Sequence, residues 1–222
     1  MLTIFTAIGH LSLHKIDSGK RIPFVQMDQE EYAMSPHELL LWSGLAFRIM
    51  TKNELQDYYN LEISRQKLPE KPDFDYILRR LLIRGIIVNG TGRTAVDALY
   101  RLLGPLRIIP VRDRLHLRLF ACIRLWLRGH LSFCQFLHYM KRPENTPMEN
   151  LLLKLVTESS FSAAQLIGCI DAGSQADPSS GIETPCTDSH DYIEYTALHH
   201  PQYPVLQGIA NLYLKKQILF LK

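Results

Sequence analysis

The chain has few cysteines, and none of them are paired in a redox or metal-binding spacing. Its 222 residues include four cysteines, and no Cys-x-x-Cys motif is present. Neither a redox pair nor the disulfide framework of a small secreted protein is therefore indicated. The apolar start at residues 1–8 is short and lacks a basic leading segment, so we expect no signal peptide. The sequence predicts reduced thiols in a cytoplasmic protein.

Long uninterrupted apolar runs are also missing. The longest apolar region, residues 115–139, contains Arg118, Arg124 and Arg128. A transmembrane helix needs about 20 predominantly apolar residues, and arginine is costly near the centre of a bilayer. We therefore expect no contact with a membrane.

The motifs of common catalytic sites are absent too. The sequence has no nucleophile elbow, phosphate-binding loop, HExxH motif or dinucleotide fingerprint. Cys186, His190, His199 and His200 are zinc ligands by residue type, but their spacing matches no strong motif. The sequence predicts a protein that is not an enzyme and holds no cofactor, with a small metalloenzyme as a remote alternative.

Basic residues are present but unevenly distributed. The formal net charge of the whole chain is +3. Residues 35–142 hold 18 Lys and Arg against 9 Asp and Glu, a net +9, whereas the remainder holds 7 against 13, a net −6. A basic region beside an acidic one is typical of a protein that binds a polyanion. The alternative is that these charges are ordinary solvated helix faces.

Capping signals mark three short helices between residues 35 and 85. Ser35-Pro36-His37-Glu38 and Thr51-Lys52-Asn53-Glu54 each place a hydroxyl residue three positions before a glutamate, which is the pattern of a capping box. A third helix follows Asp73 and carries apolar residues at helical spacing up to Gly85, a typical residue just beyond a helix. The β-rich residues 86–88 and the turn Asn89-Gly90 come next.

This order resembles a winged helix-turn-helix transcriptional regulator. Residues 81–87, Leu-Leu-Ile-Arg-Gly-Ile-Ile, are similar to the end of a recognition helix that enters the first strand of the wing. The resemblance covers residues 35–111, about a third of the chain. It implies that the third helix binds the major groove of double-stranded DNA. Winged helices also serve as protein–protein interaction modules, which is the alternative function.

The wing departs from the simple pattern. Thr94 is placed to cap a helix over residues 95–103, and residues 106–111 are β-rich. We expect residues 86–88 to pair with residues 108–111, with the helix inserted between them.

The expected DNA contacts are basic or aromatic side chains near the third helix and the wing tip. Arginine can bind guanine bidentately, and any basic side chain can bind phosphate. Because Arg79 follows Asp75 by four residues, an intrahelical ion pair is the alternative for this arginine. The expected DNA-binding residues are Arg65, Lys67, Lys71, Tyr76, Arg79, Arg80, Arg84 and Arg93.

Together these patterns predict a mainly α protein with a small β-sheet (α+β). It would consist of an N-terminal β segment (1–34), a winged-helix domain (35–111) and a helical C-terminal region (112–222) with a loop near 171–191. A long helix over residues 112–139, or two helices broken near residues 129–130, and the C-terminal region would support a homodimer. No internal repeat is visible in the sequence, and the apolar tail at 217–221 is expected to pack against the N-terminal strands. The residues expected to be buried together are Trp42, Leu45, Leu55, Ile77, Leu81 and Val88.

Overall fold

The structure is a computed structural model of the chain. It describes residues 1–15, 21–66, 68, 72–111, 144–158, 161–173 and 202–222. Within these ranges the protein is a mixed α+β fold with small antiparallel sheets, as the sequence predicts. In the described part of the chain, no helix is both long and apolar enough to cross a membrane.

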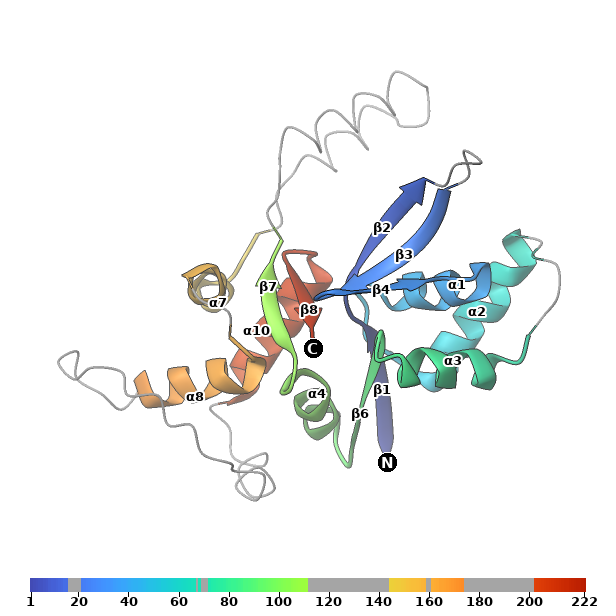
Figure 1. The fold of residues 1–222 in the computed structure, drawn as a ribbon. Helices are drawn as coiled ribbons and strands as arrows, with labels where there is room; N and C mark the ends of the chain where they lie inside the picture. Colours follow the sequence, from blue (N-terminus) through green and yellow to red (C-terminus); the bar gives the residue numbers. More distant parts are fainter. Residues whose placement is uncertain (16–20, 67, 69–71, 112–143, 159–160, 174–201) are drawn as a thin grey trace, which may run out of the picture.

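The first half of the chain forms a unit of three helices and a three-stranded sheet. Three helices, α1 (Pro36–Leu45), α2 (Lys52–Gln66) and α3 (Phe74–Ile83), pack on one side of this sheet (Figure 1). The sheet order is β5-β1-β6, so β1 (Leu2–Ala7) is central between β5 (Met50–Thr51) and β6 (Ile87–Gly92). A separate antiparallel sheet of β2 (His10–Lys15), β3 (Arg21–Met27) and β4 (Glu30–Ala33) is inserted between β1 and α1.

The helix boundaries agree with the capping signals. Ser35 accepts a hydrogen bond from the Glu38 backbone N–H at 3.3 Å, and the Glu38 carboxylate accepts one from the Ser35 backbone N–H at 2.8 Å. Thr51 and Glu54 exchange the same pair of bonds at the start of α2. Helix α3 ends before Gly85, which has a φ of +71°. The two predicted capping boxes and the glycine after the third helix are confirmed.

The predicted pairing of residues 86–88 with residues 108–111 is wrong. Strand β6 pairs with β1, and Asn89-Gly90 lies inside the strand, opposite Phe5 and Ile4, instead of forming a turn. Helix α4 (Ala95–Leu103), capped by Thr94 as predicted, packs directly on β6. A Cβ atom at Gly90 would lie 2.3 Å from the carbonyl oxygen of Ala98. Glycine is thus required there by the close approach of the helix.

The second half of the chain contains β7 (Arg107–Pro110), α7 (Pro147–Glu158), α8 (Ala163–Gly173), α10 (Gln202–Leu214) and β8 (Ile218–Leu221). Strand β7 pairs with β8, and Arg107 also forms an isolated bridge with Ser162, just before α8. The C-terminal tail therefore pairs with β7. It also packs against the N-terminal segment as expected, because Ile218 and Phe220 share a buried cluster with Ile4 and Ile8, and the Gly9 backbone N–H donates to the Phe220 carbonyl at 3.0 Å.

The two halves repeat one arrangement, contrary to the expectation of no internal repeat. Within the described residues, each half has a strand, a capped helix, a short extended bridge, two more helices and a final strand that pairs with the first; the first half adds the β2-β3-β4 sheet before its capped helix. Residues 35, 38 and 51 correspond to 146, 149 and 162, each 111 positions later, and the same capping bonds recur at 3.3 and 2.8 Å. Residues 80, 85 and 90 correspond to 211, 216 and 221, each 131 positions later. We call residues 1–92 the first unit and residues 107–222 the second unit.

The two units bury apolar residues at equivalent positions, in two clusters of which the second also includes Ile4, Ile8 and residues of α4. The pairs Leu41/Leu152, Leu55/Leu166, Leu81/Leu212 and Ile87/Ile218 are all buried. Five of the six residues expected to be buried together lie in the core of the first unit. Val88 is the exception, because neighbouring strand residues face opposite sides of a sheet. It is partly buried against the cluster of the second unit.

Tyr213 of α10 fixes the second unit to the first. Its buried hydroxyl accepts a hydrogen bond from the Phe47 backbone N–H and donates to the Ala7 carbonyl, both at 3.0 Å. Burial raises the pKa of this phenol, so it remains a donor at neutral pH. The two units are therefore joined by a buried polar contact as well as by apolar packing.

Candidate nucleic-acid interface

Helix α3 is held in place by its buried face. Asp73 caps the helix by accepting a hydrogen bond from the Tyr76 backbone N–H at 3.3 Å. Phe74, Ile77, Leu78 and Leu81 point into the core of the first unit. The opposite face is thereby turned to solvent with a fixed orientation.

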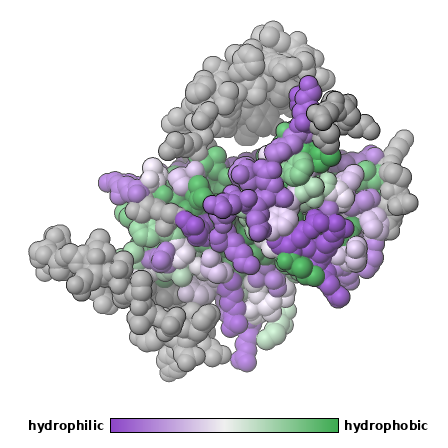
Figure 2. All heavy atoms as spheres, in the orientation of Figure 1, coloured by the Kyte–Doolittle hydropathy of each residue, from purple (hydrophilic) through white to green (hydrophobic). Residues whose placement is uncertain are grey.

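The exposed face of α3 combines charged and apolar side chains. Asp75, Tyr76, Arg79, Arg80 and Ile83 are all exposed. Tyr76 is 62% exposed and Ile83 is 80% exposed, which are high values for large hydrophobic residues. In Figure 2, strongly hydrophilic side chains over α3 lie beside a small hydrophobic spot. This surface can therefore bind both polar and apolar groups of a ligand.

Arg80 and Arg84 hold α3 against α1. The Glu38 carboxylate, 2% exposed as a residue, pairs with Arg84 Nη1 at 2.9 Å and with Arg80 Nε at 3.1 Å through its Oε1 atom. Its Oε2 atom caps α1. Replacing either arginine would leave the buried negative charge of Glu38 less compensated, which is costly in a protein interior. Both arginines are expected DNA contacts; Arg84 is partly buried in this cluster, whereas Arg80 keeps 47% of its side chain exposed.

Asp75 pairs with a residue of another helix. Lys52, at the start of α2, lies 2.7 Å from Asp75. The alternative of an Asp75–Arg79 ion pair is therefore not what the structure contains. Among the described residues Arg79 has no ion-pair partner, so its guanidinium is available to a ligand. Lys52 is basic and about half exposed beside this face, and sequence reasoning missed it. The position of Lys52 directly after the capping residue Thr51 could have placed it at the exposed start of α2.

The remaining expected residues are more widely spread. Arg65 is exposed at the end of α2 and pairs with Glu62 at 2.9 Å. Lys67 and Lys71 lie outside the described residues, as does the predicted helix at 112–139. Of the loop predicted near 171–191, residues 171–173 instead form the last part of α8, and the remainder lies outside the described residues. Arg93 follows β6, whose six residues span roughly 20 Å from the end of α3. The structure thus groups Tyr76, Arg79 and Arg80 but not Arg65 or Arg93.

The backbone near Arg93 is fixed by an ion-paired carboxylate. Asp97 accepts a hydrogen bond from the Arg93 backbone N–H at 3.0 Å and pairs with Arg101 at 2.7 Å. Partial burial of Asp97 opposes its ionisation, but the hydrogen bonds from Arg101 and Arg93 outweigh this effect and hold its pKa below the usual range. The Arg93 side chain itself is exposed.

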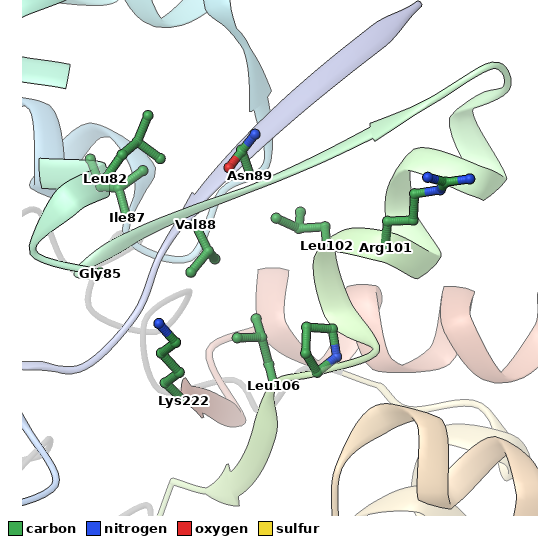
Figure 3. A pocket seen from close by; sticks show the side chains of 10 residues that line it. Leu82, Gly85, Ile87, Val88, Asn89, Arg101, Leu102, Leu106 and Lys222 are labelled. Carbon is green, nitrogen blue, oxygen red and sulfur yellow. The ribbon is translucent and has the colours of Figure 1, made fainter. Parts of the chain in front are cut away.

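A cavity of about 240 Å³ lies between the end of α3, β6, α4 and Lys222. Val88, Leu102, Leu106 and Lys222 point toward one another across it (Figure 3). Its walls are mostly apolar, with an ammonium group on one side. Over the described ranges, no cluster of three His, Cys, Asp or Glu residues could hold a metal ion.

Comparisons with known proteins identify no relative. No protein-family model, curated protein or solved structure matches the chain.

Proposed function

We propose that the protein is a DNA-binding transcriptional regulator with no enzymatic activity, and that α3 of its first unit enters the major groove of double-stranded DNA. The observation that carries this proposal is the exposed face of α3. This face is rigidly positioned and presents Arg79, which has no ion-pair partner among the described residues. Affinity would come from arginine and lysine bound to phosphate, and specificity from side chains of α3.

The element order of the first unit supports a winged-helix interpretation. Three helices with α3 as the third are followed by a strand, as in the winged helix-turn-helix pattern. In this proposal β1 occupies the place of the returning strand of the wing, and Arg93 lies where β6 leaves the sheet. Lys52 forms an ion pair with Asp75. This pairing reduces the repulsion between Asp75 and an approaching phosphate.

Within the described residues, helix α10 of the second unit has no exposed charged pair equivalent to Asp75 and Arg79 of α3. The residues that correspond to Asp75 and Arg79 are Leu206 and Ala210, and both are buried. The second unit would therefore support the first, and a homodimer would bring two α3 helices to one operator. In this proposal the protein is a homodimer and acts in the cytoplasm.

The test is the salt dependence of duplex binding. Fluorescence anisotropy with labelled genomic fragments would be recorded at several salt concentrations between about 50 and 200 mM for the full chain. The Arg79→Ala substitution is expected to weaken binding and to lower the slope of log affinity against log salt by about 1. Lys154→Ala, which removes an exposed charge from α7 of the second unit, is the matched control and should change neither.

A protein-interaction module is the second candidate function. Ile83 and Tyr76 favour it, because both are highly exposed on the same side of α3, where a partner protein could cover them together. The absence of binding to any duplex at the lowest salt concentration would support this candidate and contradict the DNA proposal.

A further inference from the structure

Tyr76, Arg79 and Ile83 form a narrow stripe along the exposed face of α3. At 100° per residue they lie within an arc of about 60°. Along the helix axis Arg79 lies about 4.5 Å and Ile83 about 10.5 Å beyond Tyr76. All three side chains are exposed. A ligand that meets this face therefore meets an aromatic ring, a guanidinium and a branched aliphatic group in that order.

The flanks of the stripe are committed to protein contacts. Asp75 on one side pairs with Lys52 at 2.7 Å, and Arg80 on the other side pairs with Glu38 at 3.1 Å. Arg79 between them has no ion pair with any residue that the structure describes. The stripe is thus the part of α3 whose binding groups are not used within the first unit.

We infer that this stripe reads a guanine next to thymines in the major groove, with Arg79 on the guanine and with Ile83 and Tyr76 on thymine methyl groups. The inference rests on the proposed function. The guanidinium fork matches the O6 and N7 acceptors of guanine, and apolar side chains contact the thymine 5-methyl group. The axial spacings of about 4.5 and 6 Å correspond to one to two base-pair steps of 3.4 Å.

The exposed apolar residues make base reading a better explanation than phosphate binding alone. An arginine that binds only phosphate needs no apolar neighbours, whereas Ile83 gains free energy only when it is covered by another apolar group. In the major groove the thymine methyl is the apolar group that a base pair presents. Burying one methyl-sized group corresponds to about a fourfold gain in affinity.

The experiment starts from a duplex selected out of a random pool by the full chain. Each selected guanine is then replaced by 7-deazaguanine, which lacks the N7 acceptor, and each selected thymine by uracil, which lacks the methyl group. Wild-type affinity should fall about 5-fold or more at one guanine, within the range of a bidentate arginine contact. It should fall about fourfold at a thymine within two base pairs.

Matched variants assign each loss to a side chain. Arg79→Ala should be insensitive to 7-deazaguanine, and Ile83→Ala should be insensitive to uracil at one thymine. Leu61→Ala, which shortens an exposed apolar residue of α2, should keep both losses. Unchanged thermal unfolding of all three variants excludes misfolding as the cause.

The outcomes separate this inference from the proposed function. Enrichment of a duplex whose affinity is unchanged by both base analogues, or variants that keep both losses, would overturn the inference and leave DNA binding intact. A pool with no enriched duplex would overturn the proposed function itself.

Discussion

The two units share one skeleton but differ in what their third helices expose. Helices α3 and α10 follow equivalent helix pairs and end at equivalent residues with positive φ, Gly85 at +71° and Lys216 at +61°. On α3 the outer face carries Asp75 and Arg79 in solvent, whereas the corresponding Leu206 and Ala210 of α10 are buried. The comparison teaches that the skeleton is set by caps and core residues, and that the proposed function depends on a few positions of one helix.

Both units have a buried glutamate that caps the first helix and forms an ion pair with a basic residue at the end of the third. Glu38 is bound by Arg84, and Glu149 is bound by the corresponding Lys215 at 2.6 Å. In the first unit Arg80 adds a second ion pair, and in the second unit Asn211 lies beside Glu149 in its place. Each unit thus uses one buried carboxylate to cap its first helix and to bind the end of its third.

The largest expected effects test the equivalence of the two cores. Leu81→Ala and Leu212→Ala each remove a buried leucine from the third helix of a unit. Each substitution should lower the free energy of unfolding by about 2–5 kcal/mol, as for leucines in close-packed cores. Urea unfolding followed by circular dichroism measures the loss. An unchanged midpoint for either variant would contradict the equivalence.

The next prediction concerns one position that the units use in opposite ways. Leu206→Ala should cost about 2–5 kcal/mol because Leu206 is buried. The corresponding Asp75→Ala should stay within about 0.5 kcal/mol, because it removes only an exposed ion pair with Lys52. The same urea titration compares them, and equal losses would remove the distinction between the two helices.

Glu149 should give the protein an acid-dependent stability. Burial of Glu149 opposes its ionisation, but the hydrogen bonds from Lys215 and from the Thr146 backbone N–H outweigh this and hold its pKa below the usual value of 4.5. A carboxylate whose folded-state pKa is lowered contributes its full stabilisation above the unfolded-state pKa and loses it as the pH falls through the folded-state pKa.

The variant Glu149→Gln should lower the free energy of unfolding by about 1.5–3 kcal/mol at pH 7, as expected for hydrogen bonds to a charged group. The difference from wild type should shrink below about pH 4.5. Glu158→Gln, an exposed glutamate at the end of the same helix, is the control. A difference that does not change with pH would refute the role of the charge.

The smallest expected effects concern the residues with positive φ that follow α3 and α10, Gly85 and Lys216. Gly85→Ala should cost about 1 kcal/mol, because a Cβ atom disfavours positive φ. Lys216→Gly should instead add a few tenths of a kcal/mol, since relief of the same strain is partly offset by the conformational entropy of glycine and by loss of the Phe47 ring contact. Thermal unfolding of both variants would show opposite shifts, and shifts of the same sign would contradict the equivalence of the two ends.

The local features of the first unit follow from its sequence because they depend on neighbouring residues. The hydroxyl–glutamate spacing at residues 35–38 and 51–54 located α1 and α2, and Gly85 located the end of α3. The predicted strand pairing failed for the opposite reason. The partner of β6 is β1, 80 to 90 residues earlier in the chain, and periodicity carries no information on such distant pairing.

The repeat escaped detection because its spacing changes along the chain. The offset is 111 residues through the first two helices and 131 residues through the third, since a longer segment precedes α10. The residues of the candidate interface were also predicted only in part, because some of their contacts join distant parts of the chain. Tyr76 and Arg79 lie on the exposed face of α3 as expected, but the contacts of Arg80 and Arg84 with Glu38 join residues over 40 positions apart.

The central claim is that α3 binds duplex DNA and that α10 does not. Backbone amide NMR of the full chain, titrated with a DNA duplex, tests it most directly. The account predicts that the largest shift changes follow the exposed residues of α3, from Asp75 to Ile83, and that the amides of α10 change little. Shifts concentrated in the second unit, or no shifts with any duplex at low salt, would contradict it.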